Sequence, residues 1–213
     1  MRIRFLTIPL LLFGLFACNQ STKQSSQQEV KAAINTWKQE LLAAKQIGPP
    51  CDYTSMASPE AQKWREANPG QLDGLPADDK AIKTVWFDLN NDHKKDLLLY
   101  FQGVNCTGHN GGTQTYAKII YSDSTADSNV MEEIIHAIQA EYNRMKETDP
   151  DLKAITSDYM TTTTTITGYH NGITGTFRLY TNEDAHCCPS YSGTYTYRLQ
   201  TKKMTLRISE EDN

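Results

Sequence analysis

Residues 82–102, with the sequence IKTVWFDLNNDHKKDLLLYFQ, contain two apolar runs on either side of a short polar stretch. The runs at 82–88 and 96–102 include the β-branched and aromatic residues that favour strands. The polar stretch is short enough to join two strands that lie next to each other. We therefore predict an antiparallel hairpin at this point of the chain.

Segments on both sides of this hairpin have apolar residues at helical spacing. The first is 29–47, which a Gly-Pro-Pro sequence ends, and the second is 129–147. A shorter helix is expected at 59–67, where Ser58 is a good N-cap and a proline suits the first turn. The apolar positions of the long helices are Val30, Ala33, Ile34, Trp37, Leu41 and Leu42, and then Val130, Ile134, Ile135, Ile138 and Tyr142.

The rest of the chain favours antiparallel strands. Asn171-Gly172 is a dipeptide typical of tight hairpin turns, and it separates two runs rich in β-branched residues. Further strands are expected at 116–121, 160–167, 173–180, 194–200 and 204–208. We therefore predict an α+β fold, with two main helices packed on a largely antiparallel β-sheet, in a single globular domain at 29–213.

Residues 1–18 have the pattern of an export signal. Two arginines precede an apolar run at 5–16, and the segment ends in Leu-Phe-Ala-Cys. The run is shorter than the ~20 residues that span a bilayer as a helix. The last four residues resemble the lipobox of bacterial lipoproteins. That resemblance implies that 1–17 is a signal peptide, and that Cys18 becomes the first mature residue and carries lipid such as palmitate, which anchors the protein in a membrane.

The segment at 18–28 is polar and is predicted to be a flexible tether between the lipid and the domain. In lipoproteins of the enterobacterial type, a residue other than aspartate after the cysteine implies the outer membrane, and here that residue is Asn19. Removal of 1–17 takes away two arginines and no acid, so the formal net charge changes from −4 to −6. An acidic chain without a basic patch excludes nucleic acid as a partner.

The polar loop of the hairpin has oxygen-bearing side chains at alternate positions. Calcium prefers six to eight oxygen ligands, which a tight loop with alternating Asp and Asn supplies. The seventh loop position would contribute only its backbone carbonyl. The candidate calcium ligands are Asp88, Asn90, Asp92, Lys94 and Asp96.

This loop resembles the calcium loops of the FG-GAP and VCBS type, in which one strand runs into the loop and an apolar strand follows it. His93 stands where that pattern has glycine, at a position where φ is commonly positive. The twelfth position is Leu99, where an EF-hand requires glutamate, so an EF-hand is excluded. The resemblance implies a calcium ion that rigidifies the hairpin. The alternative is a polar turn whose Asp and Asn side chains bond their own backbone.

Four cysteines remain besides Cys18, and a protein exported to an oxidising compartment is expected to pair them. Cys187 and Cys188 are neighbours whose α-carbons lie about 3.8 Å apart, below the usual range for a disulfide. We therefore expect each of them to bond a distant partner. Cys51 and Cys106 would then take one of them each.

A metal site is the alternative use of these residues. Two histidines and three thiolates from this set could bind zinc or copper. An oxidising compartment favours disulfides instead, because a metal-binding cysteine must stay reduced. The candidate residues for zinc or copper are Cys106, His109, His186, Cys187 and Cys188.

No nucleophile, base and orienting group stand in a recognisable catalytic pattern, and no organic cofactor is implied. We predict a cell-envelope lipoprotein with a non-enzymatic binding or accessory domain, whose partner is an envelope protein or a glycan. Tyr191, Tyr195 and Tyr197 alternate along one strand and are a candidate aromatic binding patch. The alternative is a small envelope hydrolase with its site on loops.

Overall fold

The computed structural model describes residues 18–51, 58–71, 73–106, 113–123, 127–128, 130–149, 164–179, 189 and 191–210. Within these residues the helices are α1 Cys18–Ala43, α2 Pro59–Ala67 and α3 Val130–Thr148, with a 3₁₀ turn η1 at Asp79–Ala81. The strands are β1 Asp73–Gly74, β2 Lys83–Phe87, β3 Asp96–Gln102, β4 Val104–Asn105, β5 Thr115–Ile120, β6 Asp127–Ser128, β7 Thr165–Tyr169, β8 Ile173–Leu179, β9 Tyr191–Arg198 and β10 Lys203–Glu210.

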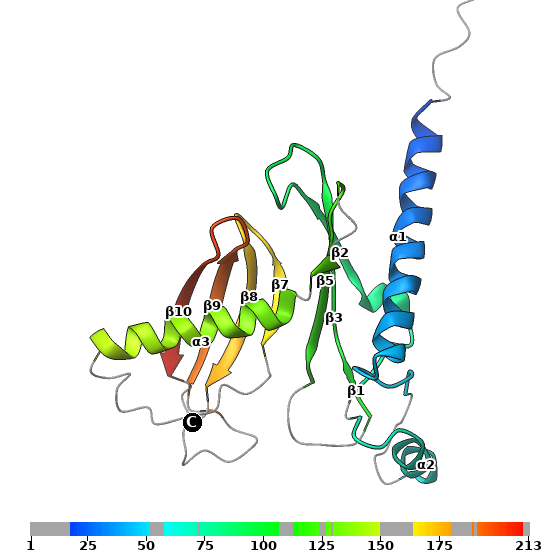
Figure 1. Ribbon diagram of the computed structural model, residues 1–213. Helices are drawn as coiled ribbons and strands as arrows, with labels where there is room; N and C mark the ends of the chain where they lie inside the picture. The colour runs from blue at the N-terminus through cyan, green and yellow to red at the C-terminus, as the bar shows by residue number, and fades with distance from the viewer. Residues whose placement is uncertain are drawn as a thin grey trace, which may run out of the picture.

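The described strands form two antiparallel four-stranded sheets and a short two-stranded pair (Figure 1). The first sheet has the order β2-β3-β5-β6, the second has the order β10-β9-β8-β7, and β1 pairs with β4. The α+β class and the antiparallel pairing are confirmed. The prediction that the helices pack on a single sheet is wrong, because the strands after α3 pair among themselves in two hairpins and do not extend the first sheet.

The hairpin at 82–102 forms as predicted, and its second strand, β3, lies between two cores. Leu99 and Phe101 belong to the apolar cluster that contains α1, whereas Leu98 belongs to the cluster that contains α3 and the second sheet. Successive side chains of a strand point to opposite faces, so β3 is buried on both. A strand buried on both faces has a continuous apolar run, as the Leu-Leu-Leu-Tyr-Phe sequence of β3 does.

Helix α1 packs on the first sheet through Ile34, Trp37 and Leu41. The helix begins at Cys18, so the polar segment 18–28 forms its first turns, where the sequence predicts a flexible tether. Figure 1 shows this part of α1 extending beyond β2 and β3. A helix rises about 1.5 Å per residue, less than half the reach of an extended chain, so a helical segment holds Cys18 closer to the domain.

Helix α3 crosses the face of the second sheet (Figure 1). Glu133 fixes this arrangement, because it accepts a hydrogen bond from the Tyr197 hydroxyl at 2.5 Å and pairs with Lys202 in the turn between β9 and β10. Burial alone would raise the pKa of Glu133, but the hydrogen bonds from Lys202 and Tyr197 outweigh it and lower that pKa. The turn between β7 and β8 is Asn171-Gly172, with φ of 53° and 150°, as the sequence predicts.

Candidate functional site

The predicted calcium loop joins β2 to β3 at one end of the first sheet. Asp96, the first residue of β3, is almost fully buried. Its carboxylate accepts hydrogen bonds from the backbone N–H of Leu89 at 2.8 Å and from that of Ser122 at 2.9 Å. These bonds are charge-assisted and therefore stronger than ordinary ones. Asp96 thus holds the loop against the segment that follows β5.

Asp88 and Asp92 organise the rest of the loop. Asp88 accepts hydrogen bonds from the backbone N–H of Asp92 at 3.0 Å and from that of His93 at 2.9 Å. Asp92 accepts one from the N–H of Lys94 at 2.8 Å and one from the Asn90 side chain at 3.2 Å. The hydrogen bond from Lys94 is the main reason why the pKa of Asp92 lies below its ordinary value. The loop oxygens thus bond loop amides, as in the polar-turn alternative.

The backbone of the loop carries strain at His93. Its φ is 67°, in the left-handed region that glycine adopts at little cost and other residues adopt rarely. This is the position at which the FG-GAP and VCBS pattern has glycine. Within the described ranges, no group of three or more His, Cys, Asp and Glu side chains is placed to hold a metal ion. Calcium in this loop therefore stays a prediction.

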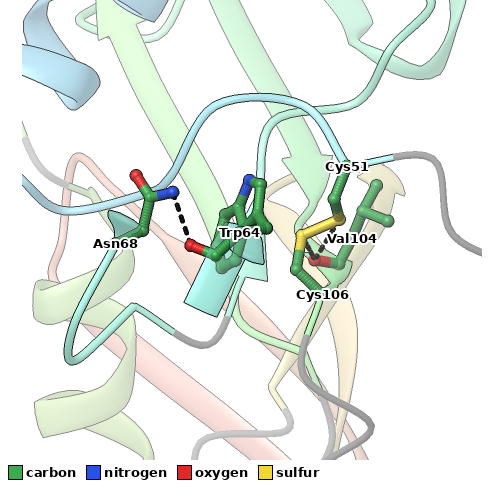
Figure 2. The surroundings of a disulfide bond; sticks show 5 residues. All are labelled: Cys51, Trp64, Asn68, Val104 and Cys106. Atoms are coloured by element: carbon green, nitrogen blue, oxygen red, sulfur yellow. Dashed lines mark hydrogen bonds between the residues drawn. A yellow bond between two sulfur atoms is a disulfide. The ribbon is translucent and has the colours of Figure 1, made fainter. Parts of the chain in front are cut away.

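Cys51 and Cys106 form a disulfide, with their α-carbons 5.7 Å apart (Figure 2). The prediction that each of them bonds Cys187 or Cys188 is therefore wrong. The reason is the pairing of β1 with β4, together with a bridge from the segment after α1 to β1, which brings the two cysteines together. A Cβ atom added at Gly74 of β1 would lie 2.5 Å from the Cys106 sulfur, so only glycine lets these segments approach this closely.

The disulfide packs against Trp64 of α2 (Figure 2). That helix has the predicted N-cap, since the Ser58 hydroxyl accepts a hydrogen bond from the N–H of Ala61 at 3.1 Å. Because Cys106 is bonded to Cys51, it offers no thiolate to the zinc or copper alternative. The other members of that set, His109, His186, Cys187 and Cys188, lie outside the described residues.

The aromatic patch predicted along β9 does not lie on the surface. Tyr195 and Tyr197 are 2% and 1% exposed and belong to the core beneath α3. Their face of the strand is the buried one, and Gly175 of β8 leaves room for the Tyr195 ring. These tyrosines therefore hold the second sheet and α3 together and are not available to an external partner.

A cleft of about 700 Å³ lies between α1, β5 and α3, within the size range of ligand-binding pockets. Sequence reasoning missed this site. Its one signal is Lys118, a charged residue between the apolar residues Ala117 and Ile119 of β5. The lining residues are Trp37, Glu40, Leu41, Ala44 and Gln46 near α1, Gln114, Thr115, Tyr116, Ala117 and Lys118 along β5, Met131, Glu132 and Ile135 of α3, and Thr164.

The polar groups of this cleft are placed by β5. The Lys118 ammonium is nearly buried and pairs with Glu40 of α1 at 2.6 Å. The Tyr116 hydroxyl donates to the backbone oxygen of Gln46 at 3.1 Å, and burial is the main reason why its pKa is raised. The phenol is therefore neutral at physiological pH. The Thr115 hydroxyl is buried and has no hydrogen-bond partner within the described part of the chain.

None of the described helices is long and apolar enough to cross a membrane. In comparisons with known proteins, no family model, no curated protein and no solved structure matches this chain.

Proposed function

We propose that this chain is a lipid-anchored protein of the bacterial cell envelope, whose globular part is a non-enzymatic binding or accessory domain. The observation that carries this proposal is the Cys51–Cys106 disulfide, because disulfides persist in exported proteins and are rare in the cytosol. It agrees with the export signal and lipobox at 1–18, which independently predict an oxidising compartment and a lipid on Cys18.

The lipid anchor is tested by Cys18→Ala in the full chain, expressed in a Gram-negative bacterium. We expect the unaltered protein in the washed outer-membrane fraction and the Cys18→Ala protein either uncleaved or released from that fraction, because the thiol that carries the lipid is lost. Sucrose-gradient fractionation with immunoblotting measures the distribution. Ser21→Ala, a nearby substitution that leaves the thiol in place, is the matched control.

Membrane association that survives Cys18→Ala through high-salt and carbonate washes would overturn the lipid anchor. Mass spectrometry of the mature N-terminus provides the second readout. We expect a diacylglyceryl or acyl modification on Cys18, and an unmodified N-terminus there would contradict the proposal.

Calcium is proposed as a structural ion of the loop at 88–96. Asp88, Asn90 and Asp92 already direct their side-chain oxygens into one turn. The main-chain carbonyl of Lys94 and the carboxylate of Asp96 are the other loop ligands in the resemblance. Each carboxylate oxygen that accepts one N–H keeps a second lone pair for a cation. A hard divalent ion would also offset the repulsion between the two aspartates of the turn.

Titration of calcium into the metal-stripped full chain is expected to give saturable heat and to raise the melting temperature. Asp88→Asn/Asp92→Asn should abolish both effects, because it removes two charged ligands and keeps their size. Glu60→Gln/Glu66→Gln removes the same two charges from the exposed face of α2 and should leave both effects unchanged. Absence of heat, or heat that persists in the aspartate variant, would reduce this loop to a polar turn.

A further inference from the structure

The cleft follows the edge of β5. Five consecutive residues, from Gln114 to Lys118, line it. Alternate side chains of a strand point to opposite faces, and here Ala117 contacts the α3 cluster whereas Lys118 reaches Glu40 of α1. Residues of both faces can line one cleft only if that cleft runs along the edge of the strand. The cleft is therefore bounded by α1 on one side, by α3 on the other and by the β5 backbone at its base.

The hydrogen-bond pattern of β5 shows which backbone groups face this cleft. The carbonyl of Gln114 accepts a hydrogen bond from the N–H of Gly103 at 2.9 Å and therefore points to the β3 side, and its N–H donates to the Asp73 carboxylate at 2.7 Å. In an antiparallel ladder this direction alternates, so the N–H and C=O groups of Thr115 and Ala117 point to the other side. Within the described ranges, β6 covers that side only at Ile119 and Ile120.

The cleft also contains a polar side chain that lacks a partner. Thr115 is 8% exposed, and its hydroxyl has no hydrogen-bond partner among the described residues. A buried hydroxyl without a partner is destabilising, so a ligand that bonds it gains more than at the surface. Together with the outward backbone groups of Thr115 and Ala117, it forms a row of donors and acceptors along one strand edge.

We propose that this edge of β5 binds an extended peptide by strand addition, which names the partner class of the binding function proposed above and rests on it. The peptide continues the line of β6 and bonds the N–H and C=O groups of Thr115 and Ala117. Its side chains alternate between the two walls of the cleft, and those that face α3 are apolar because they meet Met131 and Ile135. A β-branched sequence suits this role.

Charge sets a further requirement on the peptide. Among the described residues, the charged side chains that line the cleft are Glu40, Glu132 and Lys118, and the Lys118 ammonium is already paired with Glu40. Glu132 lies exposed on the α3 rim. The cleft thus carries an excess of negative charge, and the whole chain is acidic as well. A peptide with a basic residue beside its apolar segment complements this negative charge of the cleft, whereas a peptide with an acidic residue there is repelled by it.

The test uses the full chain and three acetylated, amidated heptapeptides. In each peptide valine alternates with threonine between the two end residues. Both end residues are lysine in the first peptide, serine in the second and glutamate in the third. We expect saturable binding in the order lysine, serine, glutamate. At saturation, amide hydrogen exchange at Thr115 and Ala117 should slow about tenfold or more, measured by NMR. Methylation of the peptide nitrogens that face β5 should weaken binding about tenfold, because it removes donors and keeps the side chains.

Ala117→Pro is the matching change in the protein. Proline removes an N–H that faces the cleft and is tolerated at a strand edge, so peptide affinity should fall while the far-ultraviolet spectrum is kept. If this variant does not fold, the methylated peptides still decide the question. Slow exchange of the two amides without peptide, no binding by any of the three peptides, or equal binding of the methylated ones would overturn the proposal.

Failure of this proposal and failure of the proposed function give different results. If the protein is lipid-anchored but the added peptides leave the β5 amides unprotected, the envelope function stands and the peptide site is wrong. If the protein binds the peptides but is not retained in the membrane fraction, the peptide site stands and the lipid anchor is wrong.

Discussion

Removal of the Cys51–Cys106 disulfide is expected to lower the free energy of unfolding by roughly 4 kcal/mol. The bond joins residues 55 positions apart, and a cross-link of that length removes a large amount of conformational entropy from the unfolded chain. The variant is Cys51→Ala/Cys106→Ala in the full chain, compared with the unaltered protein by urea denaturation under non-reducing conditions. Since Cys106 is fully buried against Trp64, the lost packing of two sulfur atoms adds to the effect.

Peptide mapping identifies the bonded pair directly. Digestion without reduction should release one linked species that contains Cys51 and Cys106, and reduction should separate it. Links from Cys51 or Cys106 to Cys187 or Cys188 would contradict the pairing and restore the sequence-based expectation. A stability loss under about 1 kcal/mol would show that the native state gains little from the bond, as happens when the cross-link is strained.

The disulfide also shows where sequence reasoning stops. The α2 helix was predictable because its signals are local: the Ser58 cap and the proline after it are adjacent in the sequence. The pairing of Cys51 with Cys106 depends on β1 and β4, which are two residues long each. Strands that short have no periodicity, so the sequence carries no sign that they pair. Only geometry in three dimensions joins them.

The two sheets illustrate the same limit at a larger scale. The β7–β8 hairpin follows from its Asn171-Gly172 turn and was predicted. Whether two hairpins join one sheet or make another depends on long-range contacts. The rings of Phe87 of β2 and Tyr169 of β7 stack with their centroids 3.9 Å apart, so the two sheets contact each other through side chains and not through strand pairing. No local pattern distinguishes these arrangements.

The candidate sites divide in the same way. The aspartates of the loop at 88–96 could be predicted as a site from the sequence, because residues that are close along the chain also lie close together in a turn. The cleft along β5 was not visible, because α1, β5 and α3 meet there from three distant segments. Lys118 is the residue that could have pointed to it, since a nearly buried lysine needs a partner, and that partner is Glu40 of the first helix.

Phe101→Ala is expected to destabilise the protein by about 3 to 5 kcal/mol. Phe101 is 2% exposed, and its ring contacts Trp37 of α1 edge-to-face at 5.1 Å and stacks on Tyr116 of β5 at 5.2 Å. Truncation removes both aromatic contacts and leaves a cavity between the helix and the sheet. Thermal unfolding of the full chain, followed by circular dichroism, should show a melting temperature roughly 10 °C lower.

Trp86→Ala is the control, because Trp86 lies on the adjacent strand of the same hairpin and is 40% exposed. We expect a change of about 0.5 kcal/mol or less, despite the larger side chain that is removed.

Leu98→Ala provides the third comparison. Leu98 lies in the same strand as Phe101, three residues before it, but faces the core formed by α3 and the second sheet. A loss of about 2 to 5 kcal/mol is expected there too. If Leu98→Ala were as mild as Trp86→Ala while Phe101→Ala was severe, β3 would be buried on one face only, and the arrangement of two cores around a central strand would be wrong. If both are severe, the continuous apolar run of β3 is explained by burial on both of its faces.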